Sequence, residues 1–203
     1  MIKVLMASLS LVALQAVSFA PAQAQQASDP IVVMQTTRGP IALQIYANGA
    51  PLTSNNFLDL VQKGFYNGLS FHRVETWCIQ GGDPQGNGTG NYIDPETHQP
   101  RYLTIEINKR LRHNMPGVLA MARSNDPNSA SCQFYITKQA MPQLDGNYAI
   151  FGRVVRGMRS VDMIRVGDRI ISAEIQQPQT SAEQTAPANP QSLGRGKTES
   201  SGF

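Results

Sequence analysis

The chain has 203 residues, of which 41% are hydrophobic and 15% are charged. This length is enough for one ordinary domain with its own core. The formal net charge of +3 is too small to indicate nucleic-acid binding, and the one short basic run, Lys109-Arg110-Leu111-Arg112, is typical of a solvated loop.

The N-terminus is typical of a secretory signal peptide. Lys3 is its only charged residue, residues 4–19 are uncharged, and Ala22 and Ala24 form a small-x-small cleavage site. We predict a signal peptide over residues 1–24, cleaved after about Ala24, and a mature periplasmic protein that does not bind a membrane. The alternative is a retained anchor, but an interrupted apolar stretch of about 16 residues spans a bilayer poorly.

The C-terminal segment, residues 177–203, is rich in Pro, Gln and Ser and has only Leu193 and Phe203 as large apolar residues. Such a composition buries too little apolar surface to offset the entropy of ordering, so we predict a disordered tail. A linker to a partner protein is the alternative. Residues 25–176 remain as the single folded domain.

Two cysteines, Cys78 and Cys132, are present. A pair of cysteines in an exported protein is a candidate disulfide, but the sequence does not supply the geometry that a bridge requires. A bridge and two unpaired thiols are therefore both open.

Alternating apolar residues predict short strands. Ile41, Leu43 and Ile45 alternate with small or polar residues, which indicates a hairpin over residues 32–46 with Gly39 in the turn. Further strands are predicted over residues 69–74, 77–80, 118–122, 133–137, 149–155 and 170–175.

Two helices are predicted, one early and one late. The first has Thr53 as its N-cap and ends at Gly64, and the second contains Val161 and Ile164 and ends near Gly167. The buried face of the first helix consists of Phe57, Leu60 and Val61. Many short strands with only two helices indicate a closed antiparallel barrel or a sandwich rather than βαβ units.

Three segments share their order and spacing with one known family. They are Phe71-His72-Arg73-Val74 with Gln80-Gly81-Gly82-Asp83 and Gly86-Asn87-Gly88-Thr89-Gly90; Gly117-Val118-Leu119-Ala120-Met121-Ala122-Arg123 with Ser131-Cys132-Gln133-Phe134-Tyr135-Ile136-Thr137; and Leu144-Asp145-Gly146-Asn147-Tyr148-Ala149-Ile150-Phe151-Gly152. Each segment alone is a weak match, but together they span nearly the whole domain and resemble the cyclophilin signature.

The resemblance implies a mainly β fold, a closed eight-stranded antiparallel β-barrel capped by two α-helices. It implies an enzyme, a peptidyl-prolyl cis–trans isomerase that acts on the bond preceding proline. The implied partners are proline-containing polypeptides, including unfolded exported proteins, bound by a monomer. No cofactor is implied, and the scattered positions of His72, His98 and His113 do not have metal-ligand spacing.

The resemblance also assigns the residues of the site. Arg73 matches the catalytic arginine of the family, and Gln80 matches the glutamine behind it. Ala122 and Arg123 fall on the segment that binds the backbone of the substrate.

The next strand and the following turn complete the implied proline pocket. Gln133 and Tyr135 match the glutamine and the aromatic residue of that strand, although phenylalanine is usual where Tyr135 stands. Leu144 matches an apolar wall, and Tyr148 takes a position where members carry histidine or tyrosine.

The segment between Arg73 and Gln80 departs from the family pattern. It is one residue shorter and lacks the common Pro-Gly, so that Trp77 takes the place of a pocket phenylalanine and Cys78 that of a methionine. Gln143 stands where many eukaryotic members carry a tryptophan that aids cyclosporin binding, so we expect weak binding of that drug.

An arginine beside an apolar pocket suits this reaction. Amide resonance sets the rotational barrier at about 18–20 kcal/mol, and the proline nitrogen regains a lone pair when the bond twists. A guanidinium that hydrogen-bonds this nitrogen stabilises the twisted state more than either planar isomer, which is catalysis by differential binding.

Two other classes of function remain open. The short segment around Trp77 is consistent with a non-catalytic chaperone or adaptor that binds proline-containing peptides without turning them over. The tail alone motivates an interaction scaffold.

Overall fold

The computed structural model describes residues 29–176. The predicted signal peptide (residues 1–24) and the predicted tail (residues 177–203) lie outside the described residues. No helix between residues 29 and 176 is both long and apolar enough to cross a membrane.

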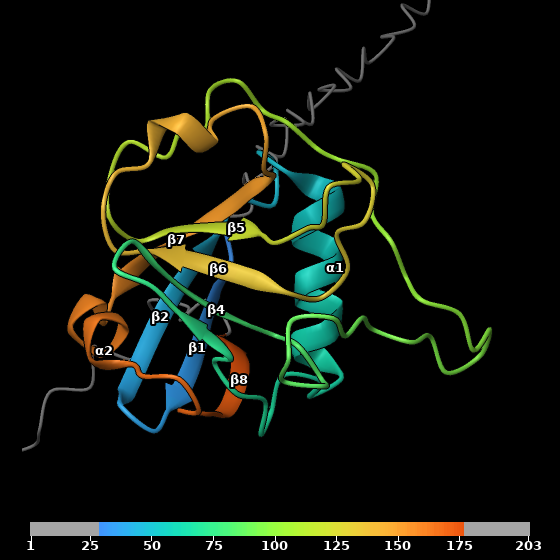
Figure 1. Ribbon diagram of the computed structural model, residues 1–203, viewed down its shortest axis with the longest axis horizontal. Helices are drawn as coiled ribbons and strands as arrows, with labels where there is room; N and C mark the ends of the chain where they lie inside the picture. Colours follow the sequence, from blue (N-terminus) through green and yellow to red (C-terminus); the bar gives the residue numbers. More distant parts are fainter. Residues whose placement is uncertain (1–28, 177–203) are drawn as a thin grey trace, which may run out of the picture.

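The architecture is mainly β, with eight strands in one antiparallel sheet of order β3-β4-β6-β5-β7-β2-β1-β8 (Figure 1). The strands are β1 (Ile31–Thr36), β2 (Gly39–Ile45), β3 (Arg73–Val74), β4 (Cys78–Gly81), β5 (Val118–Met121), β6 (Phe134–Thr137), β7 (Ile150–Arg156) and β8 (Ile170–Gln176). The predicted hairpin and strands are confirmed, except that only the last two residues of the predicted strand 69–74 belong to a strand.

The two edge strands of the curved sheet, β3 and β8, do not pair with each other. Just before β3, Ser70 makes an isolated bridge to Arg169, and the amide of Phe71 donates to the carbonyl of Asp168 at 2.8 Å. The backbone groups of residues 69–71 are used in this bridge rather than in a longer β3. The prediction of a closed barrel is therefore not confirmed, and the sheet is a half-barrel held at its edges by a short bridge.

Helices α1 (Pro51–Gln62) and α2 (Met158–Met163) lie at opposite ends of the sheet (Figure 1), and both pack against its main core. The predicted apolar face of α1 is confirmed, and the helix stops where Gly64 adopts a φ of 65°. Helix α2 is shorter than predicted because Ile164 is already extended. A 3-10 turn, η1 (Pro142–Leu144), precedes β7 and was not predicted.

A distant carboxylate caps the N-terminus of α1. Ala50 is the N-cap residue and makes no side-chain cap, so the prediction of Thr53 as N-cap is wrong. Glu106 instead accepts hydrogen bonds from the amides of Leu52 (3.1 Å) and Thr53 (2.8 Å). A negative group here satisfies otherwise free amides and interacts favourably with the helix dipole.

Alternation along the strands separates the buried side chains into two clusters. Residues on one face of β4, β5 and β6 join α1, α2 and the other strands in the main core: Ile79, Leu119, Met121, Phe134 and Ile136. The alternate residues face away from this core and belong to a smaller cluster: Cys78, Val118, Ala120 and Tyr135. The sheet thus supports a second, partly exposed apolar layer on its outer face.

The two cysteines belong to different clusters, Cys132 to the main core and Cys78 to the outer one. Cys78 lies opposite Thr137 on β6, and Cys132 precedes Thr137 by five residues, just before β6 begins; an extended segment of this length spans on the order of 16 Å. A disulfide requires Cα atoms within about 7 Å. The possible Cys78–Cys132 disulfide is therefore not formed, and both thiols are free and buried.

Replacing Glu106 by Ala should lower the free energy of unfolding by about 1–2 kcal/mol, because two helix amides lose their acceptor. Denaturant unfolding of the purified domain measures this loss. Glu96→Ala is the matched control, since Glu96 is exposed, and it should change stability by less than about 0.5 kcal/mol. Equal losses in both variants would contradict the cap.

Both thiols should be unreactive in the folded protein. Burial raises the pKa of Cys78 to about 11 and that of Cys132 to about 12, so almost no thiolate is present at pH 8. We expect no reaction with a disulfide reagent such as DTNB under native conditions. Two free thiols per chain should react in denaturant without reductant, and a count of zero would establish a bridge.

Candidate active site

The strand register brings three of the predicted site residues into one row. Arg73 on β3 lies opposite Gln80 on β4, and Gln80 lies opposite Tyr135 on β6. Residues directly opposite each other in antiparallel strands present their side chains on the same face. This face is the outer one, so the row lies over the smaller apolar cluster.

A directed chain of hydrogen bonds runs from Arg73 across the sheet. Arg73 Nη1 donates to Gln80 Oε1 at 3.1 Å, and Gln80 Nε2 donates to Gln133 Oε1 at 3.0 Å. Gln133 Nε2 then donates to the carbonyls of Gly88 (3.1 Å) and Gly90 (2.9 Å). Because a guanidinium only donates, each amide must turn its oxygen toward Arg73 and its NH₂ group away from it.

The remaining contacts of Arg73 come from the short segment that follows it. Its Nε lies 3.3 Å from Glu75 Oε1, and its guanidinium carbon lies 5.3 Å from the centre of the Trp77 ring. These contacts use Nε and one face of the guanidinium, which leaves Nη2 without a hydrogen-bond partner among residues 29–176. The sequence pattern did not indicate Glu75.

Beside Arg73 lies an apolar patch made of four predicted wall residues, Trp77, Tyr135, Leu144 and Tyr148. The Tyr135 ring stands edge-on to those of Trp77 (5.9 Å between centroids) and Tyr148 (5.7 Å). Such edge-to-face contacts stabilise the positions of aromatic rings beyond what the burial of their apolar area contributes. Cys78 lies fully buried under the patch.

Arg123 connects the apolar patch to the neighbouring turn. Its Nε donates to the carbonyl of Asn147 at 2.9 Å, and its Nη1 donates to the carbonyl of Ser124 at 2.8 Å. Its guanidinium carbon lies 4.8 Å from the centre of the Tyr148 ring. The positively charged guanidinium of Arg123 therefore lies over the ring of Tyr148, one of the aromatic walls of the patch.

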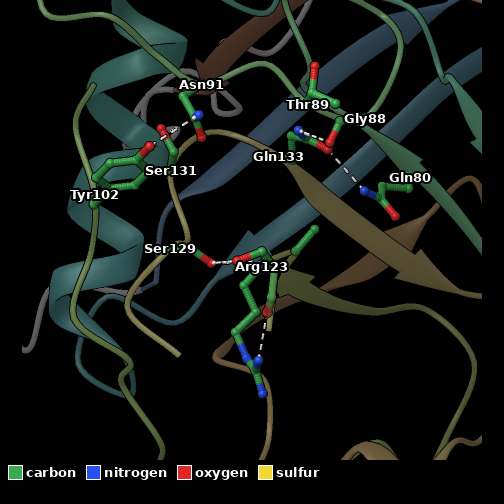
Figure 2. Close-up of a pocket in the computed structure, with 11 residues that line it drawn as sticks. Gln80, Gly88, Thr89, Asn91, Tyr102, Arg123, Ser129, Ser131 and Gln133 are labelled. Carbon is green, nitrogen blue, oxygen red and sulfur yellow. Dashed lines mark hydrogen bonds between the residues drawn. The ribbon is translucent and has the colours of Figure 1, made fainter. Parts of the chain in front are cut away.

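A cavity of about 370 Å³ is lined by both glutamines and by Arg123, which also contacts Tyr148 of the patch. Figure 2 shows Gln133 between Gln80 and Gly88 at the rim of this cavity. Its lining is Gln80, Gly88, Thr89, Asn91, Tyr102, Ala122, Arg123, Ser124, Ser129, Ser131 and Gln133. Four predicted site residues thus line the cavity, whereas Arg73 and the aromatic walls do not.

The sequence did not identify most of this cavity. Gly88 and Thr89 of the exposed glycine-rich loop 86–90 form part of its rim. Buried Asp83 shapes that loop by accepting the amides of Gln85 (2.8 Å), Asn87 (2.9 Å) and Gly88. Burial opposes ionisation, but these amides prevail and hold the pKa of Asp83 below its usual value.

A second missed feature lies behind the apolar patch. The hydroxyl of Tyr135 lies 2.9 Å from Nε2 of fully buried His113, whose Nδ1 lies 3.0 Å from Asp145 Oδ1. Burial lowers the pKa of His113 although Asp145 opposes this shift, so the neutral imidazole is favoured. The only sequence signal was a tyrosine at a position where phenylalanine is usual.

Among residues 29–176, no three His, Cys, Asp or Glu side chains cluster in a way that could hold a metal ion. The site offers two partly exposed cations (Arg73 and Arg123), two amides and an apolar surface. This set can bind a peptide and donate hydrogen bonds to it.

Comparison with known proteins agrees with this arrangement. Peptidyl-prolyl cis-trans isomerase CYP18-2 of Arabidopsis thaliana is 41% identical over 137 residues, which cover 67% of this chain and 80% of that protein. Peptidyl-prolyl cis-trans isomerase cypE of Dictyostelium discoideum is 43% identical over 135 residues, covering 66% and 83%.

Solved structures share the fold. A Cryptosporidium parvum cyclophilin, whose crystal structure was determined in the presence of the dipeptide Ala-Pro, superposes with a TM-score of 0.65 at 29% identity and covers 72% of this chain and 99% of that one. A cyclophilin from Hirschia baltica, 21% identical, shares the fold with a TM-score of 0.59, covering 72% and 74%. The model of the cyclophilin type peptidyl-prolyl cis-trans isomerase/CLD family matches residues 31–182. The chain therefore belongs to the cyclophilin-type peptidyl-prolyl cis-trans isomerases.

Proposed function

We propose that the chain isomerises X-Pro bonds in exported polypeptides and that Arg73 is its catalytic residue. The observation that carries this proposal is the position of Arg73, whose Nη2 has no partner in the described chain and whose guanidinium lies against Trp77 of the apolar patch. The Cryptosporidium relative studied with Ala-Pro supports a proline-containing ligand for this surface.

In this mechanism the apolar patch holds the prolyl ring while the preceding carbonyl rotates. Twisting returns the lone pair to the proline nitrogen, and a free N–H of Arg73 donates to it. Gln80 restrains the guanidinium through Nη1, so that little reorganisation is needed when the bond twists. No nucleophile or proton transfer is required. Each 1.4 kcal/mol by which the site stabilises the twisted state over the planar state increases the rate about tenfold.

The backbone flanking the proline passes over the glutamine pair toward the cavity in this proposal. Gln80, Gln133 and Arg123 line the cavity, and Arg123 also contacts Tyr148 of the patch. Amide side chains suit this position because they can both donate to and accept from a peptide backbone.

A second candidate function, peptide binding without turnover, is favoured by one observation. Glu75 pairs with the Nε of Arg73 at 3.3 Å, and its carboxylate competes with a substrate for the guanidinium. Peptide binding by NMR titration with no acceleration of exchange would support this alternative over catalysis.

We also propose export, on the strength of the signal-like residues 1–24. X-Pro bonds isomerise in tens of seconds without a catalyst, which limits the folding of exported chains that contain them. Fractionation of a bacterium expressing the full chain should recover a mature periplasmic monomer. N-terminal sequencing should begin at about Gln25, and a retained Met1 would contradict export.

Arg73→Ala should lower the rate of isomerisation at saturating peptide at least about 100-fold, equivalent to about 2.7 kcal/mol of transition-state stabilisation. NMR exchange spectroscopy on an Ala-Pro peptide measures the rate, and titration measures affinity, which should change by less than about threefold. Arg159→Ala, an exposed change on α2, is the matched control and should behave as wild type. An unchanged rate in Arg73→Ala would exclude this mechanism.

A further inference from the structure

We propose that His113 is a positioning residue that sets the spacing between two walls of the prolyl site, Tyr135 and Leu144, resting on the function proposed above. These walls come from separate segments, strand β6 and the turn η1. His113 lies in neither segment, and it bonds to both of them.

Three contacts join His113 to the segment around η1. Its backbone carbonyl accepts from the amide of Met141 at 2.7 Å, just before the turn. Its backbone amide donates to Asp145 Oδ1 at 2.7 Å, just after the turn, and its ring Nδ1 lies 3.0 Å from the same oxygen. Leu144 is the last of the three residues between these anchors, so the position of this wall follows that of His113.

The fourth contact joins His113 to strand β6. Its Nε2 lies 2.9 Å from the hydroxyl of Tyr135, and the two rings are stacked with an interplanar angle of 10°. Asp145 Oδ1 accepts from an amide and from Nδ1, and ionised Asp145 can only accept, so the Nδ1 of His113 carries the proton. Nε2 is then an acceptor, and the hydroxyl of Tyr135 donates to it.

Because these hydrogen-bonded side chains are buried, each of them requires its partner. His113 is fully buried and Tyr135 is 3% exposed, so a missing partner would leave a polar atom without water. On the outside, Arg112 Nε lies 2.8 Å from Asp145 Oδ2 and holds the carboxylate in place. Each polar atom of the Asp145, His113 and Tyr135 side chains therefore has a partner.

The kinetic effect of this device follows from the geometry of the reaction. The prolyl ring stays in place while the other side of the bond rotates, so the walls contact it equally in the cis, trans and twisted states. Interactions of this kind contribute uniform binding, which changes KM and leaves kcat unaltered. Arg73 has the opposite signature, because it acts on the twisted state.

The test uses three variants of the full chain: His113→Leu, Tyr135→Phe and the double variant. We expect KM for an Ala-Pro peptide to rise at least about fivefold in each, with kcat within about twofold of wild type. The double variant should be no worse than the worse single variant, since both changes break one linkage. His98→Asn, which removes an exposed histidine that belongs to neither the patch nor the cavity lining, should leave both constants unchanged.

A size probe separates wall spacing from general destabilisation. Pipecolic acid has one more ring methylene than proline. The ratio of KM for a pipecolic-acid peptide to KM for the proline peptide should be larger in wild type than in His113→Leu or Tyr135→Phe. Nitrogen-15 NMR of wild type should show a proton on Nδ1 of His113. A proton on Nε2, unchanged ring-size selectivity, or multiplicative losses in the double variant would each overturn the proposal.

The following outcomes separate a failure of this proposal from a failure of the proposed function. If wild type binds the peptide without accelerating exchange, catalysis fails, and the same variants are compared by dissociation constant. If His113→Leu does not fold, Tyr135→Phe decides alone, and a wild-type KM in that variant overturns the role of His113. Absence of any peptide binding by wild type would overturn both proposals.

Discussion

The register of four strands is the constraint on which the site depends. In the order β3-β4-β6-β5, Arg73 faces Gln80, Gln80 faces Tyr135, and Tyr135 faces Ala120. Because side chains alternate across a sheet, this row lies on the outer face while Ile79 and its neighbours fill the main core. A slip of one residue in any pair would exchange the two faces and remove both the core and the site.

Given that register, the donor-only character of arginine orders the polar part of the site. Arg73 can only donate, so the Gln80 amide presents its oxygen to it, and the Gln133 amide follows the same direction to the carbonyls of Gly88 and Gly90. One charged side chain thereby sets two amides and anchors the loop that borders the cavity. The same series of hydrogen bonds restrains the guanidinium of Arg73 without burying it.

Local pattern was sufficient where the cause is local. The alternation of Ile41, Leu43 and Ile45 predicted the hairpin, and the order and spacing of three motifs identified the family. The cap of α1 was missed because its acceptor, Glu106, is 53 residues from Thr53. The link from His113 to Tyr135 joins residues 22 apart on different segments, and no periodicity records such a contact.

The distribution of burial within the site suits its chemistry. The walls must not move while the bond rotates, and Tyr135 is 3% exposed with its hydroxyl bonded inside the protein. In the proposed mechanism the cation meets a nitrogen whose lone pair develops only as the bond twists, and the side chain of Arg73 is 43% exposed. Full burial of an unpaired guanidinium would be costly, whereas a partly exposed one is solvated while the site is empty. Under this proposal a bound peptide excludes water from the guanidinium, which strengthens the hydrogen bond that distinguishes the twisted from the planar state.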